Sequence, residues 1–345
     1  MTETAQNFES IQDIAIKLVQ EQMKNSNANN ETKERTIFVL GSKGVGKTTI
    51  INRFLDRDDP ARPTLALEYS FGRRTSPGQG VQKQVCNVWE LGCLANSNQL
   101  VEVPVRSHGI ENFFALIVLD LSEPAHIWTH LEASLNGLRE AYRNNCHDAE
   151  ITKGRERTRE KIGNEHPDVN TLELFPFPCV IVGGKYDIFQ DLDSEIKKHV
   201  CRCLRSIAHT IGAALVFYSV KNSALAKTMR DTMNHLGFGS PSNPFRSNST
   251  DYNGPLIIAF GGDSWEKIGV TPSNSDRIGI VYVTAVPQKE KKDQDNNSDT
   301  DKNAENKDLG FREAYIDELR AQKDEELLRL IKDIELKSKF ETIIV

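Results

Sequence analysis

Short runs of β-branched and aromatic residues alternate with longer helical segments through the middle of the chain. The runs predict strands at 36–40, 85–91, 113–119, 179–182 and 214–218, and the helical segments fall at 47–55, 124–144, 192–211 and 222–236. Buried strands joined by crossover helices form a mostly parallel sheet with helices on both faces. The pattern therefore predicts an α/β fold, to which 256–260 and 278–286 would add further strands.

Two segments outside this region place apolar residues at helical spacing among polar neighbours. The first, at 8–24, carries Phe8, Ile11, Leu18 and Val19. The second carries Tyr315, Ile316, Leu319, Leu327, Leu330 and Ile331. Polar, low-hydrophobicity sequence separates both from the middle of the chain, and such sequence cannot bury enough surface to fold. We expect an amphipathic helix and tether at 1–34, one folded domain at 35–286, a disordered charged linker at 287–310 and a detached amphipathic helix at 311–345.

The overall charge narrows the class of partner. Lysine and arginine total 43 against 49 acidic residues, which gives a net charge of -6 and a pI near 5.8. Nucleic acids and anionic membranes attract clustered positive charge, so we expect protein partners, no nucleic acid and no membrane insertion. The sequence shows no signal peptide, and its most apolar run, 113–119, is too short to span a bilayer. These features predict a cytosolic protein.

The six cysteines include no C-x-x-C pair. Cys201 and Cys203 lie close to His199, but this spacing fits no structural zinc site. We therefore expect reduced, mostly buried thiols.

A phosphate-binding motif follows the first predicted strand directly and opens the first predicted helix. The segment 41–48 reads G-S-K-G-V-G-K-T and matches G-x-x-x-x-G-K-(S/T). In such a motif the lysine reaches the β and γ phosphates and the final hydroxyl binds Mg²⁺, so these roles fall to Lys47 and Thr48. The alternative is an inherited turn that binds nothing. The candidate phosphate-binding residues are Gly41, Ser42, Lys43, Gly44, Val45, Gly46, Lys47, Thr48 and Thr49.

The catalytic motif of small GTPases is altered in this chain. A second strand normally ends in D-x-x-G followed by glutamine, where the aspartate supports the magnesium shell and the glutamine orients the attacking water. The corresponding segment, 89–93, reads W-E-L-G-C. Trp89 takes the aspartate position, Glu90 stands one residue out of register, and Cys93 replaces the glutamine. Hydrolysis is expected to be negligible without a partner.

The base-reading motif is half preserved. N-K-x-D is replaced by G-K-Y-D at 184–187, and S-V-K at 219–221 is similar to the S-A-K motif that supports the base. The candidate base-reading residues are Lys185, Asp187, Ser219 and Lys221. Thr64 follows Pro63 in the loop after the first helix and is a candidate for the switch threonine that senses Mg²⁺; the alternative is an ordinary loop hydroxyl.

Several segments together resemble a known family. The segments are 41–49, 55–58, 63–74 with its P-T-L-A-L-E-Y and G-R-R sequences, 89–92 and 184–191. They resemble the light intermediate chains of cytoplasmic dynein, and in particular the dynein-2 branch of that family. The similarity extends over most of 35–262 and returns around 321–324.

This resemblance implies a Ras-like domain that serves as a non-catalytic accessory subunit. It implies binding to the dynein-2 heavy chain, contact with other dynein-2 subunits and intraflagellar transport train proteins, and a role in retrograde transport. It also implies a location in the cytoplasm and cytoskeleton, at the cilium and its base. No cofactor is required, although GDP or GTP with Mg²⁺ is compatible with the motif.

Two enzyme classes compete with this interpretation. One is a guanine-nucleotide-binding switch with partner-dependent GTPase activity, which would need the missing aspartate and glutamine. The other is a P-loop nucleotide kinase, which would need an arginine-rich lid. The candidate cluster for such a lid is Arg155, Arg157 and Arg159. These arginines lie in a polar helical segment that is typical of a solvated face.

Overall fold

The computed structural model describes residues 34–75, 83–93, 98–239, 249–288 and 314–343. The chain divides into two compact units, Met1–Lys292 and Asp293–Val345. The N-terminal helix predicted at 8–24 and almost all of the predicted linker lie outside the described residues.

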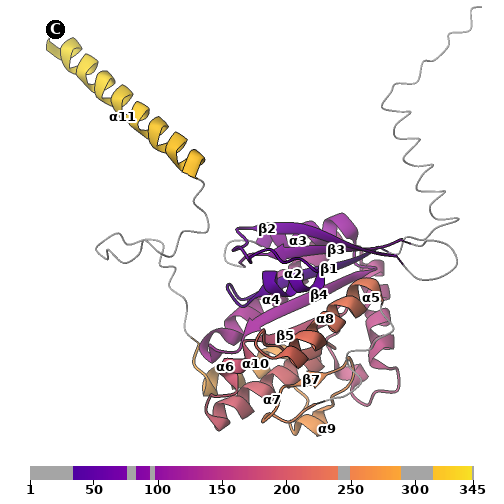
Figure 1. Ribbon diagram of the computed structural model, residues 1–345. Helices are drawn as coiled ribbons and strands as arrows, with labels where there is room; N and C mark the ends of the chain where they lie inside the picture. The colour runs from indigo at the N-terminus through magenta and orange to yellow at the C-terminus, as the bar shows by residue number, and fades with distance from the viewer. Residues whose placement is uncertain (1–33, 76–82, 94–97, 240–248, 289–313, 344–345) are drawn as a thin grey trace, which may run out of the picture. The chain divides into compact units, whose positions relative to one another are not determined.

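The first unit is built on one seven-stranded sheet with the order β2-β3-β1-β4-β5-β6-β7 (Figure 1). The strands are β1 (Glu34–Gly41), β2 (Leu67–Thr75), β3 (Lys83–Leu91), β4 (Phe113–Asp120), β5 (Cys179–Gly184), β6 (Ala214–Phe217) and β7 (Ile257–Ile258). The five central strands are parallel, and β2 and β7 pair antiparallel at the two edges. The predicted mostly parallel sheet is confirmed.

Helices cover both faces of the sheet (Figure 1). The helices are α2 (Lys47–Phe54), α3 (Asn98–His108), α4 (Pro124–Asn145), α5 (Asp148–Ile162), α6 (Tyr186–Phe189), α7 (Ser194–Thr210), α8 (Ser223–Phe238), α9 (Trp265–Ile268) and α10 (Ser275–Ala285), with a 3-10 turn η1 (Val169–Thr171). One hydrophobic cluster packs α2 and α8 against the sheet, and a second packs α3, α4 and α7 against the other face. Inward side chains of each strand alternate between the two clusters, as the pleat requires.

The prediction of a strand at 278–286 is wrong, because this segment forms most of the helix α10. The Asn274 side chain accepts from the backbone N–H of Arg277 and caps the helix start. Ile278 and Tyr282 are buried, four residues apart, whereas Ile280 is 68% exposed. A strand would have placed these three side chains on one face, so the burial follows the helical period.

The second unit contains one long helix, α11 (Ala314–Ile343). The helix predicted within 311–345 is therefore confirmed as a helix. All side chains described on it, from 318 to 332, are exposed, including Leu319, Leu327, Leu330 and Ile331. Within the described parts of the chain, no helix combines the length and the apolar character that crossing a membrane demands.

Candidate functional site

The phosphate loop (residues 41–48) connects β1 to α2 and needs glycine at three places. Gly41, Gly44 and Gly46 have positive φ angles of 128°, 71° and 101°, which side chains other than glycine rarely adopt. A Cβ on Gly41 would lie 2.0 Å from the carbonyl oxygen of Val118. Nothing lies within 4 Å of a Cβ placed on Gly44, which is exposed at the surface of the loop. The loop leads into the N-terminus of α2, whose first turn carries no acidic residue, and the free N–H groups of a helix N-terminus suit an anion.

Lys47 lies buried beneath the phosphate loop, with 4% of its surface exposed. Its ammonium donates to the carbonyl oxygens of Ser42 at 2.8 Å, Gly92 at 3.2 Å and Gly41 at 3.5 Å. Burial lowers the pKa of Lys47, and the nearby Glu90 carboxylate partly offsets that effect. The lysine thus ties the loop to the end of β3.

Glu90 meets Thr48 directly. The Thr48 hydroxyl donates to Glu90 Oε1 at 2.7 Å. Trp89 points to the opposite face of β3, where its ring packs against Tyr69 at 4.9 Å and His108 at 6.1 Å. Trp89 holds the aspartate position of the motif but faces away from the loop. Because side chains alternate along a strand, Glu90, one residue out of register, reaches Thr48 in its place.

Thr64 lies beside Thr48 and Glu90 and adds a second hydroxyl next to the phosphate loop. The backbone at Thr64 lies against Gly92, where an added Cβ would meet the Thr64 carbonyl oxygen at 2.3 Å. The Thr64 hydroxyl is buried and lies beside the Glu90 carboxyl. Its interaction with Glu90 helps to lower the pKa of that carboxyl, although burial raises it overall. Two hydroxyls and a carboxylate oxygen gathered beside the phosphate loop are the donor set that Mg²⁺ prefers.

The predicted base-reading residues also meet one another. Asp187 Oδ1 accepts from the Ser219 hydroxyl at 2.7 Å, and Asp187 Oδ2 pairs with Lys221 Nζ at 2.8 Å. The hydrogen bond from Lys221, followed by that from Ser219, lowers the pKa of the Asp187 carboxyl. These residues line a pocket of about 830 Å³ together with Tyr186, Ile188, Gln190, Asp191, Leu192, Asn222 and Ser223. A carboxylate held in this way can accept two hydrogen bonds from guanine N1–H and its amino group.

Lys185 and Gly184 connect the base-reading residues to the phosphate loop. The Lys185 ammonium pairs with Asp120 Oδ2 at 2.5 Å, and the backbone N–H of Asp120 donates to the Ser42 hydroxyl at 3.3 Å. A Cβ on Gly184 would lie 2.7 Å from Val45 Cγ2. Val45 therefore packs directly on Gly184, in the place where the asparagine side chain of N-K-x-D would lie.

The fold and these contacts define a GTPase-like P-loop domain, and comparisons with known proteins then identify the family. The profile described as Dynein light intermediate chain matches residues 16–168. The chain is 39% identical over 314 residues to cytoplasmic dynein 2 light intermediate chain 1 of Bos taurus, covering 86% of this chain and 87% of that protein. The Danio rerio protein is 37% identical over 310 residues, covering 85% and 84%.

A solved structure agrees on the fold. The crystal structure of the dynein light intermediate chain's conserved domain superposes with a TM-score of 0.54 at 16% identity, covering 75% of this chain and 92% of that one. The chain belongs to the dynein light intermediate chain family, whose members are accessory subunits of the dynein motor, and its similarity is to the dynein-2 branch.

Proposed function

We propose that the chain is a non-catalytic accessory subunit of the cytoplasmic dynein-2 motor, which binds and stabilises the heavy chain for retrograde intraflagellar transport and cilium assembly. The observation that carries this proposal is similarity along nearly the whole length of dynein-2 light intermediate chains, 86% of this chain and 87% of the Bos taurus relative. The proposed location is the cytoplasm and cytoskeleton, including the cilium and its base. Other dynein-2 subunits and transport train proteins are the further partners proposed.

Co-expression with a dynein-2 heavy-chain tail tests the proposal. The chain should co-purify with that tail in stable stoichiometry and raise its soluble yield. A dynein-1 heavy-chain tail is the matched control, because it offers the same architecture from the other motor. Equal recovery with both tails, or with neither, would contradict the assignment to dynein-2.

We propose that any nucleotide serves as a structural ligand. Lys47 and the backbone of the phosphate loop would hold the phosphates, Thr48 and Thr64 would face Mg²⁺, and Asp187 would read guanine. The contact of Thr48 with Glu90 and the buried Thr64 hydroxyl beside the same carboxyl support the fit. Mg²⁺ would neutralise phosphate charge next to the buried Glu90 carboxylate.

The competing proposal is a switch with partner-dependent GTPase activity, which would use the same Asp187–Ser219 contact to read guanine. The two proposals differ in whether GTP is hydrolysed. Cys93 follows Gly92 where a glutamine would orient water, and even Ras turns over only about 10⁻⁴ times per second unaided. Single-turnover assays with GTP, with and without the heavy-chain tail, separate the two. Stimulated turnover would favour the switch, and background rates in both conditions would favour the structural ligand.

A further inference from the structure

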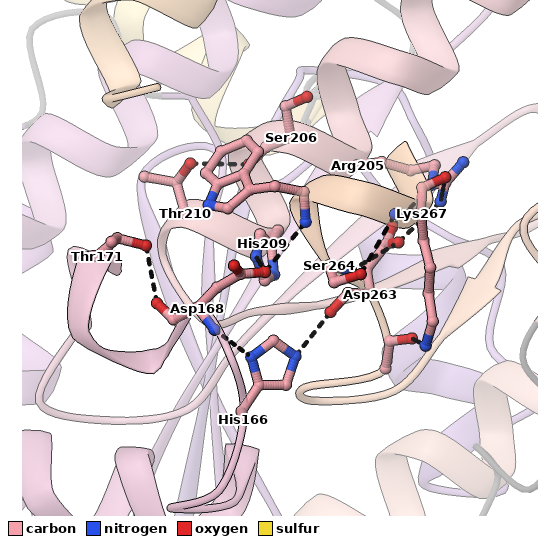
Figure 2. A network of polar contacts seen from close by, with 12 residues as sticks. His166, Asp168, Thr171, Arg205, Ser206, His209, Thr210, Asp263, Ser264 and Lys267 are labelled. Carbon is pink, nitrogen blue, oxygen red and sulfur yellow. Dashed lines mark hydrogen bonds and ion pairs between the residues drawn. The ribbon is translucent and has the colours of Figure 1, made fainter. Parts of the chain in front are cut away.

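Two histidines and an aspartate, none of them a residue of the nucleotide site described above, form a cluster (Figure 2). His166 and Asp168 come from the loop between α5 and η1, and His209 comes from the last turn of α7. One potential ligand atom from each of the three lies within 4.8 Å of the other two. We call His166, Asp168 and His209 the His-Asp-His cluster. Residues this far apart in the sequence meet only because the loop packs across α7.

The orientation of His166 is set by a backbone carbonyl. His166 Nε2 lies 2.8 Å from the carbonyl oxygen of Asp263, which can only accept, so Nε2 carries the proton. The other nitrogen, Nδ1, therefore carries the lone pair, which accepts from the backbone N–H of Asp168 at 3.2 Å and must give up that hydrogen bond to bind a metal. Histidines that bind metals usually donate their second N–H in this way, which fixes the tautomer.

The residue that orients His166 is itself held rigidly. Arg205 donates to both carboxylate oxygens of Asp263, from Nε at 2.7 Å and from an Nη at 2.8 Å. The two side chains are 12% and 5% exposed, so little solvent weakens the pair. Figure 2 shows this pair beside the cluster. A supporting layer of this kind is what a metal site requires around its ligands.

His209 and Asp168 supply the other two ligand atoms. His209 Nε2 lies 3.0 Å from Asp168 Oδ2, which also accepts from the backbone N–H of Trp265 at 3.1 Å. His209 is 5% exposed, so its ring lies almost entirely out of solvent. Trp265 packs edge-on against His209 at 4.9 Å, and its buried indole N–H lacks a partner among the described residues.

From this geometry we infer that the His-Asp-His cluster binds one divalent transition-metal ion of the zinc type. The ligands are His166 Nδ1, one Asp168 carboxylate oxygen and His209 Nε2, with water in the fourth position. His209 moves its ring proton to Nδ1, so the ion takes the place of the hydrogen between His209 and Asp168. Bonds of about 2.0 Å in a tetrahedron separate ligand atoms by roughly 3.3 Å. His209 Nε2 and Asp168 Oδ2 are 3.0 Å apart and need only a small adjustment, so the larger movement falls on His166, whose ligand atom lies within 4.8 Å of theirs. His166 lies in a loop and can make that movement.

Bound zinc would clamp the loop after α5 to α7 and to the segment before α9. The same side chains already form a hydrogen-bond network, so the experiment must distinguish a metal site from a network that is complete without metal. The full chain, stripped with a chelator, is titrated with Zn²⁺ alone by calorimetry and melted with and without it. We expect one tight equivalent and a higher melting temperature.

The variants are His166→Gln, which changes a half-buried ligand, and Asp168→Asn. Each should weaken Zn²⁺ affinity more than about tenfold and remove the thermal shift. The matched control is His199→Gln with Cys203→Ser, which removes an imidazole–thiol contact at 3.6 Å elsewhere on α7 and should leave the site intact. If His166→Gln does not fold, Asp168→Asn carries the comparison.

Replacing Zn²⁺ with Co²⁺ allows the ligands to be identified from the visible absorption spectrum. A site of two imidazoles and a carboxylate gives tetrahedral visible bands without a thiolate charge-transfer band. The inference is overturned if Co²⁺ binding shows a thiolate band, if the control variant abolishes binding, or if the intact chain shows no Zn²⁺ shift while His166→Gln lowers the metal-free melting temperature. The last result would identify a purely hydrogen-bonded network.

Discussion

The Thr48 hydroxyl donates to Glu90 Oε1 at 2.7 Å, which joins the start of α2 to the end of β3. Thr48 is the residue that would bind Mg²⁺, so Glu90 stands where it can orient that ligand. The contact also buries a carboxylate beside the Lys47 ammonium. Burial raises the pKa of Glu90 even though Thr48 and Lys47 act in the opposite direction. The folded protein therefore holds a proton on Glu90 more tightly than a free glutamate does.

The first prediction concerns Glu90→Gln. A raised pKa means that the folded state binds the proton more tightly than the unfolded state, so stability is present below the unfolded value of 4.5 and declines as pH rises through the folded pKa. Urea unfolding of the nucleotide-free protein should show this decline in the wild type and lose it in Glu90→Gln, which should be the more stable at neutral pH. Exposed Glu140→Gln is the control and should retain the wild-type profile.

The same variant should respond less to magnesium. Glu90→Gln keeps an acceptor for Thr48 but removes the charge, so Mg²⁺–GDP affinity should fall about tenfold if nucleotide binds. Calorimetric titration with GDP, with and without Mg²⁺, measures this affinity in both proteins. A variant that binds Mg²⁺–GDP as tightly as the wild type would show that Glu90 has no role in the magnesium shell.

The second prediction is that Lys47→Ala destabilises the domain without any nucleotide. The substitution leaves the carbonyls of Gly41, Ser42 and Gly92 without their shared donor, which costs about 1–3 kcal/mol. The melting temperature should fall by several degrees. Lys43→Ala changes an exposed lysine of the same loop and should leave it unchanged. Equal melting temperatures for both variants would mean that Lys47 serves only a ligand.

The sequence predicted the central sheet because strands buried on both faces are continuous apolar runs, as at Phe113–Asp120. It did not predict β2, an edge strand whose Tyr69 and Phe71 are about half exposed and whose pattern therefore lacks a buried run. It mistook α10 for a strand because Ile278–Val286 is rich in β-branched residues. The cap at Asn274 was the available signal.

The site residues that belong to short local motifs could be predicted from the sequence. The residues whose positions depend on strand geometry or on packing between distant segments could not. The phosphate loop, Asp187 and Ser219 follow from short motifs. The role of Glu90 could be recognised only from the alternation of side chains along β3, which places Trp89 and Glu90 on opposite faces. The His-Asp-His cluster carries no sequence signal, because His166 and His209 meet only through the packing of a loop on α7.

The third prediction is that restoring the base-reading asparagine fails. In Gly184→Asn the new Cβ would lie 2.7 Å from Val45 Cγ2, and relieving this overlap should cost about 1–3 kcal/mol. Adding Val45→Ala should recover most of that loss. Gly254→Asn, where the new Cβ would meet only the Asp251 carbonyl oxygen at 3.9 Å, is the control. Thermal melts of the wild type, Gly184→Asn, Val45→Ala and the double variant test the coupling, and additive losses would show that Val45 and Gly184 do not interact.

The fourth prediction concerns guanine recognition. Asp187→Asn replaces an acceptor with an amide, so GDP should lose its advantage over ADP while phosphate binding persists. Competition between GDP and ADP measures the preference. Asp191→Asn alters a carboxylate lining the same pocket and should leave the preference intact. If ADP already competes as well as GDP in the wild type, the base-reading role of Asp187 is wrong.

The last prediction concerns α11, whose apolar stripe is proposed to bind a partner. Leu327 and Ile331 are 56% and 43% exposed and lie four residues apart, hence on one face of the helix. An isolated helix gains stability chiefly by packing such a face. Replacing both with aspartate should therefore abolish capture of a transport-train partner. Because α11 belongs to a separate compact unit, the melting temperature of the 34–288 domain should not change.

Leu328→Asp is the matched control for this pair, because Leu328 is 58% exposed but lies about 100° around the helix from Leu327. It introduces the same chemistry outside the stripe and should leave partner capture intact. Pull-downs and thermal melts on the full chain give both readouts. If the double variant instead lowers the domain's melting temperature by several degrees, then α11 packs on its own domain, and its apolar stripe is covered without a partner.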